Sequence, residues 1–489
     1  MKILFFDIGE VDYKGIEILS AVLKQKGHTV DLLLDPSLGR HYYLSIPFLN
    51  RFVNQDMLIK KVQSFNPDLI AMSIVTNKFL YFREFGLLLK KHFNIPVIVG
   101  GIHPTSLPEE VIKEDWVEML CIGEGEGAMV ELAEKMQKNE DITNIQNLWV
   151  KDSNGHIHKN TLRPLIKDLD SLPLPDRSIY AQYGVLGKRL RFMTGRGCPY
   201  HCSFCVNSFR NGLYPNEKYL RKRSVPDIIA ELKEIKFKYQ PRAIRFEDDV
   251  FVLNKQWLRQ FKDEYKKHIS LPFHCYITPA GVNEEIISDL KNSGCHSIAM
   301  GIQSGNEKLR EQVMERKYSN EQVIEAANII KKYNIKLYAE YMFGVPHETP
   351  EMMWETLELS TKIKANNSWA SIFYPYPKTK LAEYCKGNKY IDDSNFNDIL
   401  IGKGNPHAYS VLKHPFSEEA YKFKIILPLY NAFPYFRNSF KKLLKKRYGK
   451  VHKLCYIIGI PLLEKREFFY RIIRIPTIIV ATRKTLKSR

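Results

Sequence analysis

Cysteine is scarce in this sequence, with eight residues in a chain of 489. Small domains held together by disulfides carry a much higher density, so a disulfide scaffold is disfavoured. Five of the eight stand alone, and we expect them to be small buried hydrophobic residues; they are Cys121, Cys275, Cys295, Cys385 and Cys455. The other three lie within one run of eight residues.

Long apolar runs are also missing, since no stretch approaches the roughly 20 residues that cross a bilayer. Met1 to Asp7 form an apolar strand pattern without the charged start and cleavage site of a signal peptide. We therefore expect a cytoplasmic protein in a reducing compartment. With 44% hydrophobic residues, the chain is long enough for two or three globular domains.

Acidic residues are nearly absent from the C-terminal end. From Tyr421 to Arg489 there are 18 Lys and Arg but only two Glu, a balance of +16 within the net charge of +19. Basic stretches alternate there with apolar ones at residues 425–430, 454–463, 468–470 and 475–480. Such alternation is typical of a face on an anionic membrane, and we expect peripheral contact with the inner membrane surface. The alternative is a solvated basic face that covers the rest of the protein.

Cys198, Cys202 and Cys205 form a Cys-x3-Cys-x2-Cys motif. A cuboidal four-iron, four-sulfur cluster takes one ligand on each iron, so three thiolates leave one iron open for a substrate or cofactor. A zinc site would need a fourth ligand from a second knuckle, and no second Cys-x2-Cys follows. The spacing therefore indicates a reactive iron–sulfur cluster.

This motif resembles that of the radical S-adenosylmethionine (SAM) enzymes, because an aromatic residue, Phe204, precedes its last cysteine. The resemblance implies that the three cysteines hold a 4Fe-4S cluster and that Phe204 contributes to cofactor binding. It also implies that the open iron binds the amino and carboxylate groups of SAM, and that one electron from the cluster cleaves SAM to a 5′-deoxyadenosyl radical. An electron donor of the flavodoxin or ferredoxin type would supply that electron.

The first 140 residues alternate between apolar strands and amphipathic helices. The expected strands are residues 2–8, 29–34, 68–75, 96–101 and 118–122, and the expected helices are residues 15–26, 79–92 and 127–138. Continuous Val, Ile and Leu runs between helices predict a parallel sheet covered on both faces, which is a doubly wound (Rossmann or flavodoxin-like) domain. Ligands bind at the carboxyl ends of such strands, which places Ser73, Thr76, Gly100 and Gly101 at the binding edge.

Two loops of this domain resemble the cobalamin-binding domain that precedes the barrel in one large branch of radical SAM enzymes. They are Val99–Glu109 and Cys121–Glu126. The stretch from Asp7 to Gly15 lacks the DxHxxG pattern of methionine-synthase-like domains, so we expect no histidine from this loop at the lower face of the cobalt. The alternative is a flavodoxin-like domain without a ligand. The resemblance implies a cobalamin site at Ser73, Thr76, Gly100, Gly101 and Glu124.

A hairpin and a linker follow this domain. Residues 148–151 and 156–159 flank an Asn154-Gly155 turn that is typical of a β-hairpin. Prolines between Leu172 and Asp176 indicate an extended linker. We therefore divide the chain into a cobalamin-binding domain, residues 1–140, a hairpin and linker, 141–183, a radical SAM barrel, 184–390, and a basic, mainly helical C-terminal region, 391–489.

Six further strand patterns alternate with helices, at residues 189–194, 243–246, 273–277, 297–302, 336–342 and 370–374. Six βα units fit the partial (β/α)6 TIM-type barrel of the radical SAM family, in which ligands bind in the loops after the strands. The expected fold class is therefore α/β in both domains.

The loop after the second of these strands carries Glu247, Asp248 and Asp249. Three adjacent carboxylates repel one another unless a cation or several hydrogen-bond donors lie near. In the family this place binds the amino group of SAM, so all three are expected to contact it.

Two later loops also match SAM-binding positions of the family. Gln303 and Ser304, after the fourth strand, are expected to bind the ribose or the methionine carboxylate of SAM. Gly344 and Val345 begin a Gly-x-Pro-x-Glu-Thr loop after the fifth strand, which in the family lies beside the adenine.

The chain is thus identified as a member of the cobalamin-binding radical SAM enzymes. It resembles the branch of the anaerobic magnesium-protoporphyrin ester cyclases, hopanoid methylases and archaeal lipid ring-forming enzymes over about residues 1–385. The resemblance implies an anaerobic enzyme that abstracts hydrogen from an unactivated carbon of a small molecule, with cobalamin-dependent methyl transfer.

Two alternatives to methyl transfer stay open. The first is radical carbon–carbon bond formation or cyclisation of a lipid or other hydrophobic substrate without methylation, which the basic and apolar tail favours. The second, less favoured, is tRNA modification or RNA binding, which the pI near 9.3 suggests. No RNA-binding domain is recognisable in the tail, so we expect no nucleic-acid partner.

Overall fold

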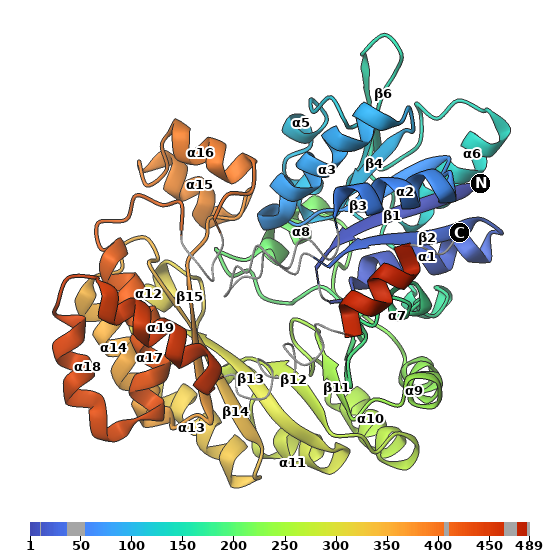
Figure 1. Ribbon diagram of the computed structural model, residues 1–489. Helices are drawn as coiled ribbons and strands as arrows, with labels where there is room; N and C mark the ends of the chain where they lie inside the picture. The colour runs from blue at the N-terminus through green and yellow to red at the C-terminus, as the bar shows by residue number, and fades with distance from the viewer. Residues whose placement is uncertain (10, 37–53, 405–409, 464–476, 487–489) are drawn as a thin grey trace. The chain divides into compact units, whose positions relative to one another are not determined.

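The computed structural model describes residues 1–9, 11–36, 54–404, 410–463 and 477–486. They form two compact units (Figure 1). The first comprises Met1–Gly187 with Phe396–Lys403 and Ile473–Arg489, and the second comprises Lys188–Asn395 with Gly404–Ile472. The compact first unit thus extends beyond the expected domain of residues 1–140 and takes in the hairpin, the linker and two segments from the far end of the chain.

A seven-stranded sheet in the order β2-β1-β3-β4-β5-β6-β7 forms the centre of the first unit. Strands β1 to β5 are parallel, whereas β6 and β7 form an antiparallel hairpin that pairs with β5. The predicted hairpin therefore extends the sheet. The strands are β1 (Lys2–Ile8), β2 (Thr29–Asp35), β3 (Leu69–Ser73), β4 (Val97–Gly100), β5 (Met119–Cys121), β6 (Leu148–Lys151) and β7 (Ile157–Lys159).

Both faces of this sheet are covered by helices, because successive side chains of a strand point to opposite faces. Ile3 and Phe5 of β1 pack with α1 and α6, whereas Leu4 and Phe6 pack with α2 and α3. The prediction of a doubly wound domain is confirmed. The helices are α1 (Lys14–Gln25), α2 (Gln55–Phe65), η2 (Thr76–Lys78), α3 (Phe79–His92), α4 (Ile102–Ser106), α5 (Pro108–Val111), α6 (Glu126–Lys138), η3 (Leu169–Ser171) and α7 (Ser178–Ala181), where η marks a 3-10 helix.

A helix near the end of the chain, residues 477–486, belongs to this first unit. Ile478 is 1% exposed and lies in the same apolar cluster as Ile3 and Phe5. The Thr485 hydroxyl donates a hydrogen bond of 3.1 Å to the carbonyl of Gln182. Ile478 is therefore a core residue, which is a correction to the expectation that residues 475–480 face a membrane.

The second unit contains six parallel strands in the order β8-β11-β12-β13-β14-β15. Strands that follow one another in the chain are thus neighbours in space, as in a barrel. The six strands of the predicted partial barrel are confirmed. They are β8 (Arg189–Phe192), β11 (Ala243–Phe246), β12 (Phe273–Ile277), β13 (Cys295–Gln303), β14 (Lys336–Phe343) and β15 (Asn367–Ile372).

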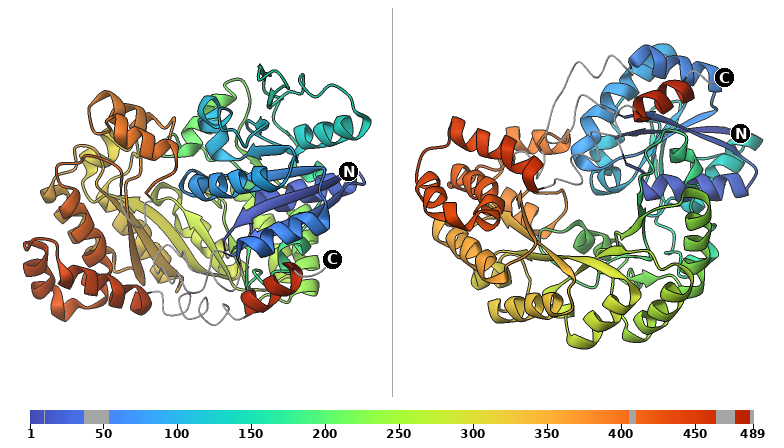
Figure 2. Two further views of the ribbon diagram at one scale, coloured as in Figure 1. Left: turned by 45° about the horizontal axis from the view of Figure 1, so that its top comes forward. Right: turned by 60° about the horizontal axis from the view of Figure 1, so that its bottom comes forward.

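Helices cover the outer face of this sheet (Figures 1 and 2). Phe246 packs edge-to-face with Phe261 and Phe273, with ring centroids 5.6 Å and 5.2 Å apart. The shorter elements that follow β8 are β9 (Gly195–Arg196), α8 (Val206–Leu213) and β10 (Arg221–Lys222). The other helices are α9 (Val225–Tyr239), α10 (Lys255–His268), η4 (Pro279–Gly281), α11 (Glu284–Ser293), α12 (Glu307–Gln312), α13 (Asn320–Lys332), α14 (Pro350–Ile363) and α15 (Lys380–Gly387), and α16 (Asp393–Leu400) has residues in both units.

The basic C-terminal region is helical, as predicted. It contains α17 (Ser417–Ala432), η5 (Pro434–Phe436), α18 (Arg437–Leu444) and α19 (Lys450–Leu463). Helix α17 packs along β15 at the edge of the sheet, and its Ile426 and Leu427 are fully buried. The expectation that residues 425–430 face a membrane is therefore wrong, whereas residues 468–470 lie outside the described residues. Among the helices that the structure describes, none is both long enough and apolar enough to cross a bilayer.

Candidate active site

The three cysteines of the motif lie in the loop that connects β9 to α8. All three are free thiols. Cys205 immediately precedes the first turn of α8, and its backbone N–H donates a 3.0 Å hydrogen bond to the carbonyl of Cys202. The antiparallel pairing of β9 with β10 supports the start of the loop. The sequence therefore places these thiols directly after the first strand of the barrel sheet.

Ser203 fastens the middle of the cluster loop to two other segments. Its backbone N–H donates to the carbonyl of Met314 at 3.2 Å, and its hydroxyl donates to the carbonyl of Val313 at 2.5 Å. The backbone N–H of Leu381 donates to the Ser203 carbonyl at 2.9 Å. The position of Cys202 is thus set by protein contacts that do not involve its thiol.

Burial and nearby charges shift the pKa values of two thiols in the cluster loop. Burial raises the pKa of Cys198 to about 12 and that of Cys205 to about 11; Asp249 and Cys202 add to both shifts, whereas Arg316 lowers the pKa of Cys205. Backbone N–H groups of Tyr200 and Asn207 hydrogen bond to these two sulfurs and favour the thiolates. The thiols therefore hold protons that iron binding must release.

No three His, Cys, Asp or Glu side chains converge on a single-ion site in the part of the chain that the structure describes. A cuboidal cluster does not require such convergence, because each cysteine binds a different iron. The three thiols of this loop therefore suit the cluster that the spacing predicts.

Arg316 joins the cluster loop to the end of β13, and the sequence analysis missed it. Its Nη1 lies 3.9 Å from the sulfur of Cys202, and its Nη2 donates to the carbonyl of Gly301 at 2.9 Å. Its Nε donates to the hydroxyl of Tyr318 at 2.9 Å, and that hydroxyl donates to the carbonyls of Gly301 and Ile302. A lone arginine in a charged segment forms no recognisable pattern, so only the folded chain identifies this contact.

Two of the three carboxylates expected to meet the SAM amino group are engaged with protein cations. Glu247 pairs with Arg191 at 2.5 Å and with Arg245 at 3.3 Å. Asp248 is 5% exposed and pairs with Lys222 at 3.1 Å, while the backbone N–H and hydroxyl of Thr194 also donate to it. Lys222, Arg191 and Arg245 place positive charge beside these two carboxylates, where the sequence analysis expected the amino group of SAM. Glu247 and Asp248 therefore form ion pairs within the protein, and their contacts with SAM stay predictions.

Asp249 differs from its two neighbours, because no ion pair of its carboxylate is found among the described residues. Its side chain is exposed, it accepts a hydrogen bond from the side chain of Asn207, and desolvation by the surrounding loops raises its pKa despite the charge of Arg210. It also influences the thiols of Cys198 and Cys205. Asp249 stays the predicted contact for a cationic group beside the cluster.

The loop after β13 contains two predicted contacts for SAM, and one of them is buried whereas the other is partly exposed. Ser304 is fully buried, its hydroxyl lies 3.4 Å from that of Thr356, and it accepts a hydrogen bond from the backbone N–H of Asn306. Gln303 is partly exposed and has a φ of 71°, where the pairing of β13 with β14 shifts register. We therefore assign Ser304 to the support of the loop, whereas Gln303 stays a predicted SAM contact.

The Gly-x-Pro-x-Glu-Thr loop is held by a buried carboxylate. Glu348 is 1% exposed, and its Oε2 accepts hydrogen bonds from the backbone N–H groups of Gly344 at 2.6 Å and Val345 at 3.4 Å. His414 Nε2 lies 3.0 Å from the Val345 carbonyl. Val345 itself is fully buried, and the contacts of Gly344 and Val345 with SAM stay predictions.

Glu348→Gln should flatten the dependence of stability on pH. Burial raises the pKa of Glu348 from 4.5 to about 8, so between these values the native state keeps a proton that the unfolded chain has lost. Stability from this group is therefore lost as pH rises from about 4.5 to about 8, by on the order of 5 kcal/mol. Melting curves at several pH values should show a smaller decline for the glutamine variant than for the wild type.

The matched control for this experiment is Glu351→Gln, because Glu351 lies three residues away but is exposed. Its melting temperatures should follow the wild type across the same range. Parallel curves for Glu348→Gln and the wild type would show that Glu348 is ionised in the native state.

The five residues expected to bind cobalamin lie after three neighbouring strands of the first unit. Ser73 ends β3 and Thr76 begins η2, Gly100 ends β4 and Gly101 follows it, and Glu124 follows β5. They share the carboxyl edge of the sheet, as predicted. Thr76 is 2% exposed, and Glu124 accepts a hydrogen bond of 3.2 Å from the backbone of Ile166. Their individual contacts with cobalamin stay predictions.

The loop after β4 packs tightly against the end of β3. A Cβ on Gly101 would lie 2.8 Å from both the N and the O of Ile74, so only glycine brings this loop so close to the end of β3. His103 of the same loop is fully buried against Phe79, with ring centroids 4.3 Å apart, and burial lowers its pKa to about 3. The ring of His103 is therefore part of the packing beneath this loop.

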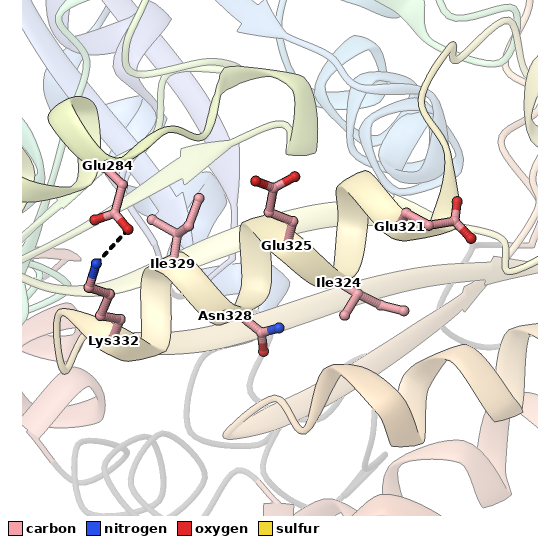
Figure 3. Close-up of a pocket in the computed structure, with 7 residues that line it drawn as sticks. All are labelled: Glu284, Glu321, Ile324, Glu325, Asn328, Ile329 and Lys332. Carbon is pink, nitrogen blue, oxygen red and sulfur yellow. Dashed lines mark hydrogen bonds and ion pairs between the residues drawn. The ribbon is translucent and has the colours of Figure 1, made fainter.

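A separate surface pocket of about 610 Å³ lies between the start of α11 and the outer side of α13 (Figure 3). Glu284 and Lys332 form an ion pair of 2.7 Å at one end of it. Its remaining walls come from Glu321, Ile324, Glu325, Asn328 and Ile329. Because no loop after a strand contributes to it, this pocket is not part of the candidate active site.

Two family models match the two units separately. The B12 binding domain matches residues 9–133, and the Radical SAM superfamily matches residues 192–360. The chain belongs to the cobalamin-binding radical SAM family. Its cofactors are therefore a 4Fe-4S cluster, SAM and cobalamin, and the radical SAM domain begins six residues before Cys198.

Known relatives of this radical SAM chain are distant. An uncharacterized methyltransferase of Pyrococcus horikoshii, PH0819, is 28% identical over 69% of this chain and 74% of its own length. The anaerobic magnesium-protoporphyrin IX monomethyl ester cyclase of Cereibacter sphaeroides is 22% identical over 73% of this chain and 60% of its own length.

A solved structure shows the same fold. The radical SAM methyltransferase TsrM of Kitasatospora setae, with cobalamin and a [4Fe-4S] cluster bound, superposes with a TM-score of 0.62 and 18% identity. The match covers 79% of this chain and 78% of TsrM. It therefore supports the arrangement of a cobalamin-binding domain followed by a radical SAM domain.

Proposed function

We propose that this radical SAM enzyme methylates an unactivated carbon of a small-molecule substrate, after the 5′-deoxyadenosyl group of SAM has removed a hydrogen atom from that carbon. The observation that carries the proposal is the combination of a three-thiol loop with a cobalamin-binding domain in one chain. The three thiols leave one corner of a cluster for SAM, and the second domain provides for a methyl carrier. The methyltransferase names of PH0819 and TsrM support this choice.

When bound, the cluster supplies an electron for the cleavage of SAM, and cobalamin supplies a transferable methyl group. The chain holds the cluster through Cys198, Cys202 and Cys205, and Ser203 keeps their loop in place. We propose that Asp249 contacts the amino group of SAM, since its neighbours are engaged with protein cations. Gln303 and the backbone of Gly344 are the proposed contacts for the rest of SAM.

The inner face of the second sheet provides a polar wall for ligands. In the strand register, Arg245 of β11 lies opposite His274 of β12. Glu340 of β14 lies opposite Gly301 of β13 and Trp369 of β15. Within the described residues Glu340 has no hydrogen bond or ion pair, and burial raises its pKa despite the charges of Arg245 and Arg316. We propose that Glu340 contacts bound SAM or substrate. An external electron donor of the flavodoxin or ferredoxin type is part of the proposal.

The products formed from SAM test the proposed methylation. Enzyme loaded with its cluster and cobalamin is incubated with SAM, a chemical reductant and a small-molecule extract of the source cells. We expect 5′-deoxyadenosine and S-adenosylhomocysteine to rise together and in equal amounts above the level without extract. The Cys202→Ala variant provides the background for both products.

A second candidate function is cyclisation or carbon–carbon bond formation, which the similarity to the ester cyclase of Cereibacter sphaeroides favours. That reaction would yield 5′-deoxyadenosine without S-adenosylhomocysteine. A rise of 5′-deoxyadenosine alone would therefore replace the methylation proposal with this one.

A further inference from the structure

The region from η5 to α19 is strongly basic and exposes apolar side chains. Residues 431–463 contain eight Lys and Arg and no Asp or Glu. Tyr435 is 98% exposed and Phe436 is 60% exposed, although both are large aromatic residues. Val451 and Leu454, one turn apart on α19, are 57% and 54% exposed. The apolar exposure is therefore concentrated in the same short region as the positive charge.

Helix α18 separates its apolar and basic residues. Leu444 is buried, whereas Lys441 and Lys442, and Lys445 directly after the helix, are exposed. Figure 1 shows α18 on the outer side of α17, whose other contacts include β15. Arg437 holds the start of α18 in place, because its Nε donates to the carbonyl of Tyr430 at 3.2 Å. The lysines thus project from a helix that is fixed to the second unit.

Few carboxylates oppose this charge. Glu418, on α17, accepts a hydrogen bond of 2.7 Å from the backbone of Tyr448, and both Glu418 and Glu419 lie 3.6 Å from Lys422. No ion pair of Lys441, Lys442 or Lys445 is found in the described residues. The lysines of α18 are therefore available to an anionic partner.

We propose that η5, α18 and the first turns of α19 form a docking surface for an anionic lipid bilayer. Exposed Tyr and Phe rings suit the boundary between headgroups and acyl chains, and lysines nearby suit anionic headgroups. Exposed aliphatic residues such as Val451 and Leu454 suit a bilayer better than a nucleic acid, which has no acyl phase to receive them. The proposal uses no residue of the active site and does not depend on the proposed reaction.

Sedimentation of the full chain with vesicles tests this surface. The vesicles are phosphatidylcholine alone and phosphatidylcholine mixed with phosphatidylglycerol. We expect binding to the anionic vesicles, little binding to the neutral ones, and release at high salt. Lys441→Gln with Lys442→Gln should weaken binding by about fivefold per lysine. Tyr435→Ser with Phe436→Ser should weaken it by roughly tenfold.

Matched controls come from exposed residues on other helices of the same unit. Phe237 on α9 is 87% exposed between two lysines, and Lys266 and Lys267 are adjacent exposed lysines on α10. Phe237→Ser and the double change Lys266→Gln with Lys267→Gln should leave binding within about twofold of the wild type. Melting temperatures of all variants should be unchanged, since none of these side chains is buried.

Three results would overturn the proposal. The first is equal binding to neutral and anionic vesicles, and the second is unchanged binding after the loss of Lys441 and Lys442. The third is absence of vesicle binding together with salt-sensitive binding of RNA, which would assign the surface to a nucleic acid.

Discussion

Cys202→Ala should abolish the cleavage of SAM. Cys202 is 7% exposed and is one of only three thiols in the cluster loop, so alanine removes a ligand that no neighbouring side chain replaces. The fold should survive, because Ser203 continues to anchor the loop to Val313, Met314 and Leu381. Iron bound after anaerobic reconstitution should fall well below the roughly four atoms per chain of an intact cluster. The formation of 5′-deoxyadenosine should fall to background.

Cys455→Ala is the matched control for this variant. Cys455 lies on α19, outside the cluster loop, so its loss should leave both the iron content and the formation of 5′-deoxyadenosine unchanged. Continued formation of 5′-deoxyadenosine by Cys202→Ala would contradict the assignment of the cluster to this loop.

Gly101→Ala should remove cobalamin from the protein while leaving the cluster in place. Gly101 has a φ of 94° and a ψ of −170°, a region that side chains other than glycine rarely adopt. The new Cβ would also lie 2.8 Å from the backbone N and O of Ile74 and 3.1 Å from the hydroxyl of Ser73. Strain and overlap together should cost on the order of 3 kcal/mol and displace the ends of β3 and β4. Cobalamin retained after gel filtration should drop at least about tenfold.

The control for Gly101 is Gly155→Ala, in the turn between β6 and β7. Gly155 has a φ of 78°, but no heavy atom lies within 4 Å of the added Cβ, so only backbone strain of about 1 kcal/mol is expected. This variant should retain cobalamin. In both variants, iron content and SAM cleavage measure whether the second unit still holds its cluster. Wild-type cobalamin content in Gly101→Ala would show that cobalamin does not bind at this edge.

Local patterns predicted most of the secondary structure. The expected bounds of residues 2–8, 243–246 and 273–277 agree with β1, β11 and β12. These strands are continuous apolar runs, or runs with clear alternation, between residues that end strands. The last strand was placed about three residues late at its start, since β15 begins at Asn367 in a polar stretch. Periodicity is weak where a strand begins with polar residues at the edge of a sheet.

Long-range contacts decided which of the predicted site residues are available to a ligand. Three carboxylates in a row predict a cation but do not identify it, and Lys222 and Arg191 come from strands 26 and 56 residues away, whereas Arg245 lies on β11 itself. The hydroxyl of Ser304 is predicted from the sequence to hydrogen bond to SAM, but in the structure it lies beside the hydroxyl of Thr356, 52 residues later. Arg316 carried no signal, because its contact with Cys202 spans 114 residues.

The sequence by itself determined the order of the two domains and the strand ends that carry the loops, and it predicted the cluster ligands, because these depend on spacing and on local hydrophobic periodicity. Only the tertiary structure decided which side chains of those loops form ion pairs or hydrogen bonds with other parts of the protein. It also decided that the apolar segments at Ile426 and Ile478 are core and that the exposed rings are Tyr435 and Phe436. Burial and ion pairing depend on partners brought together by folding, and no local pattern in a single sequence specifies those partners.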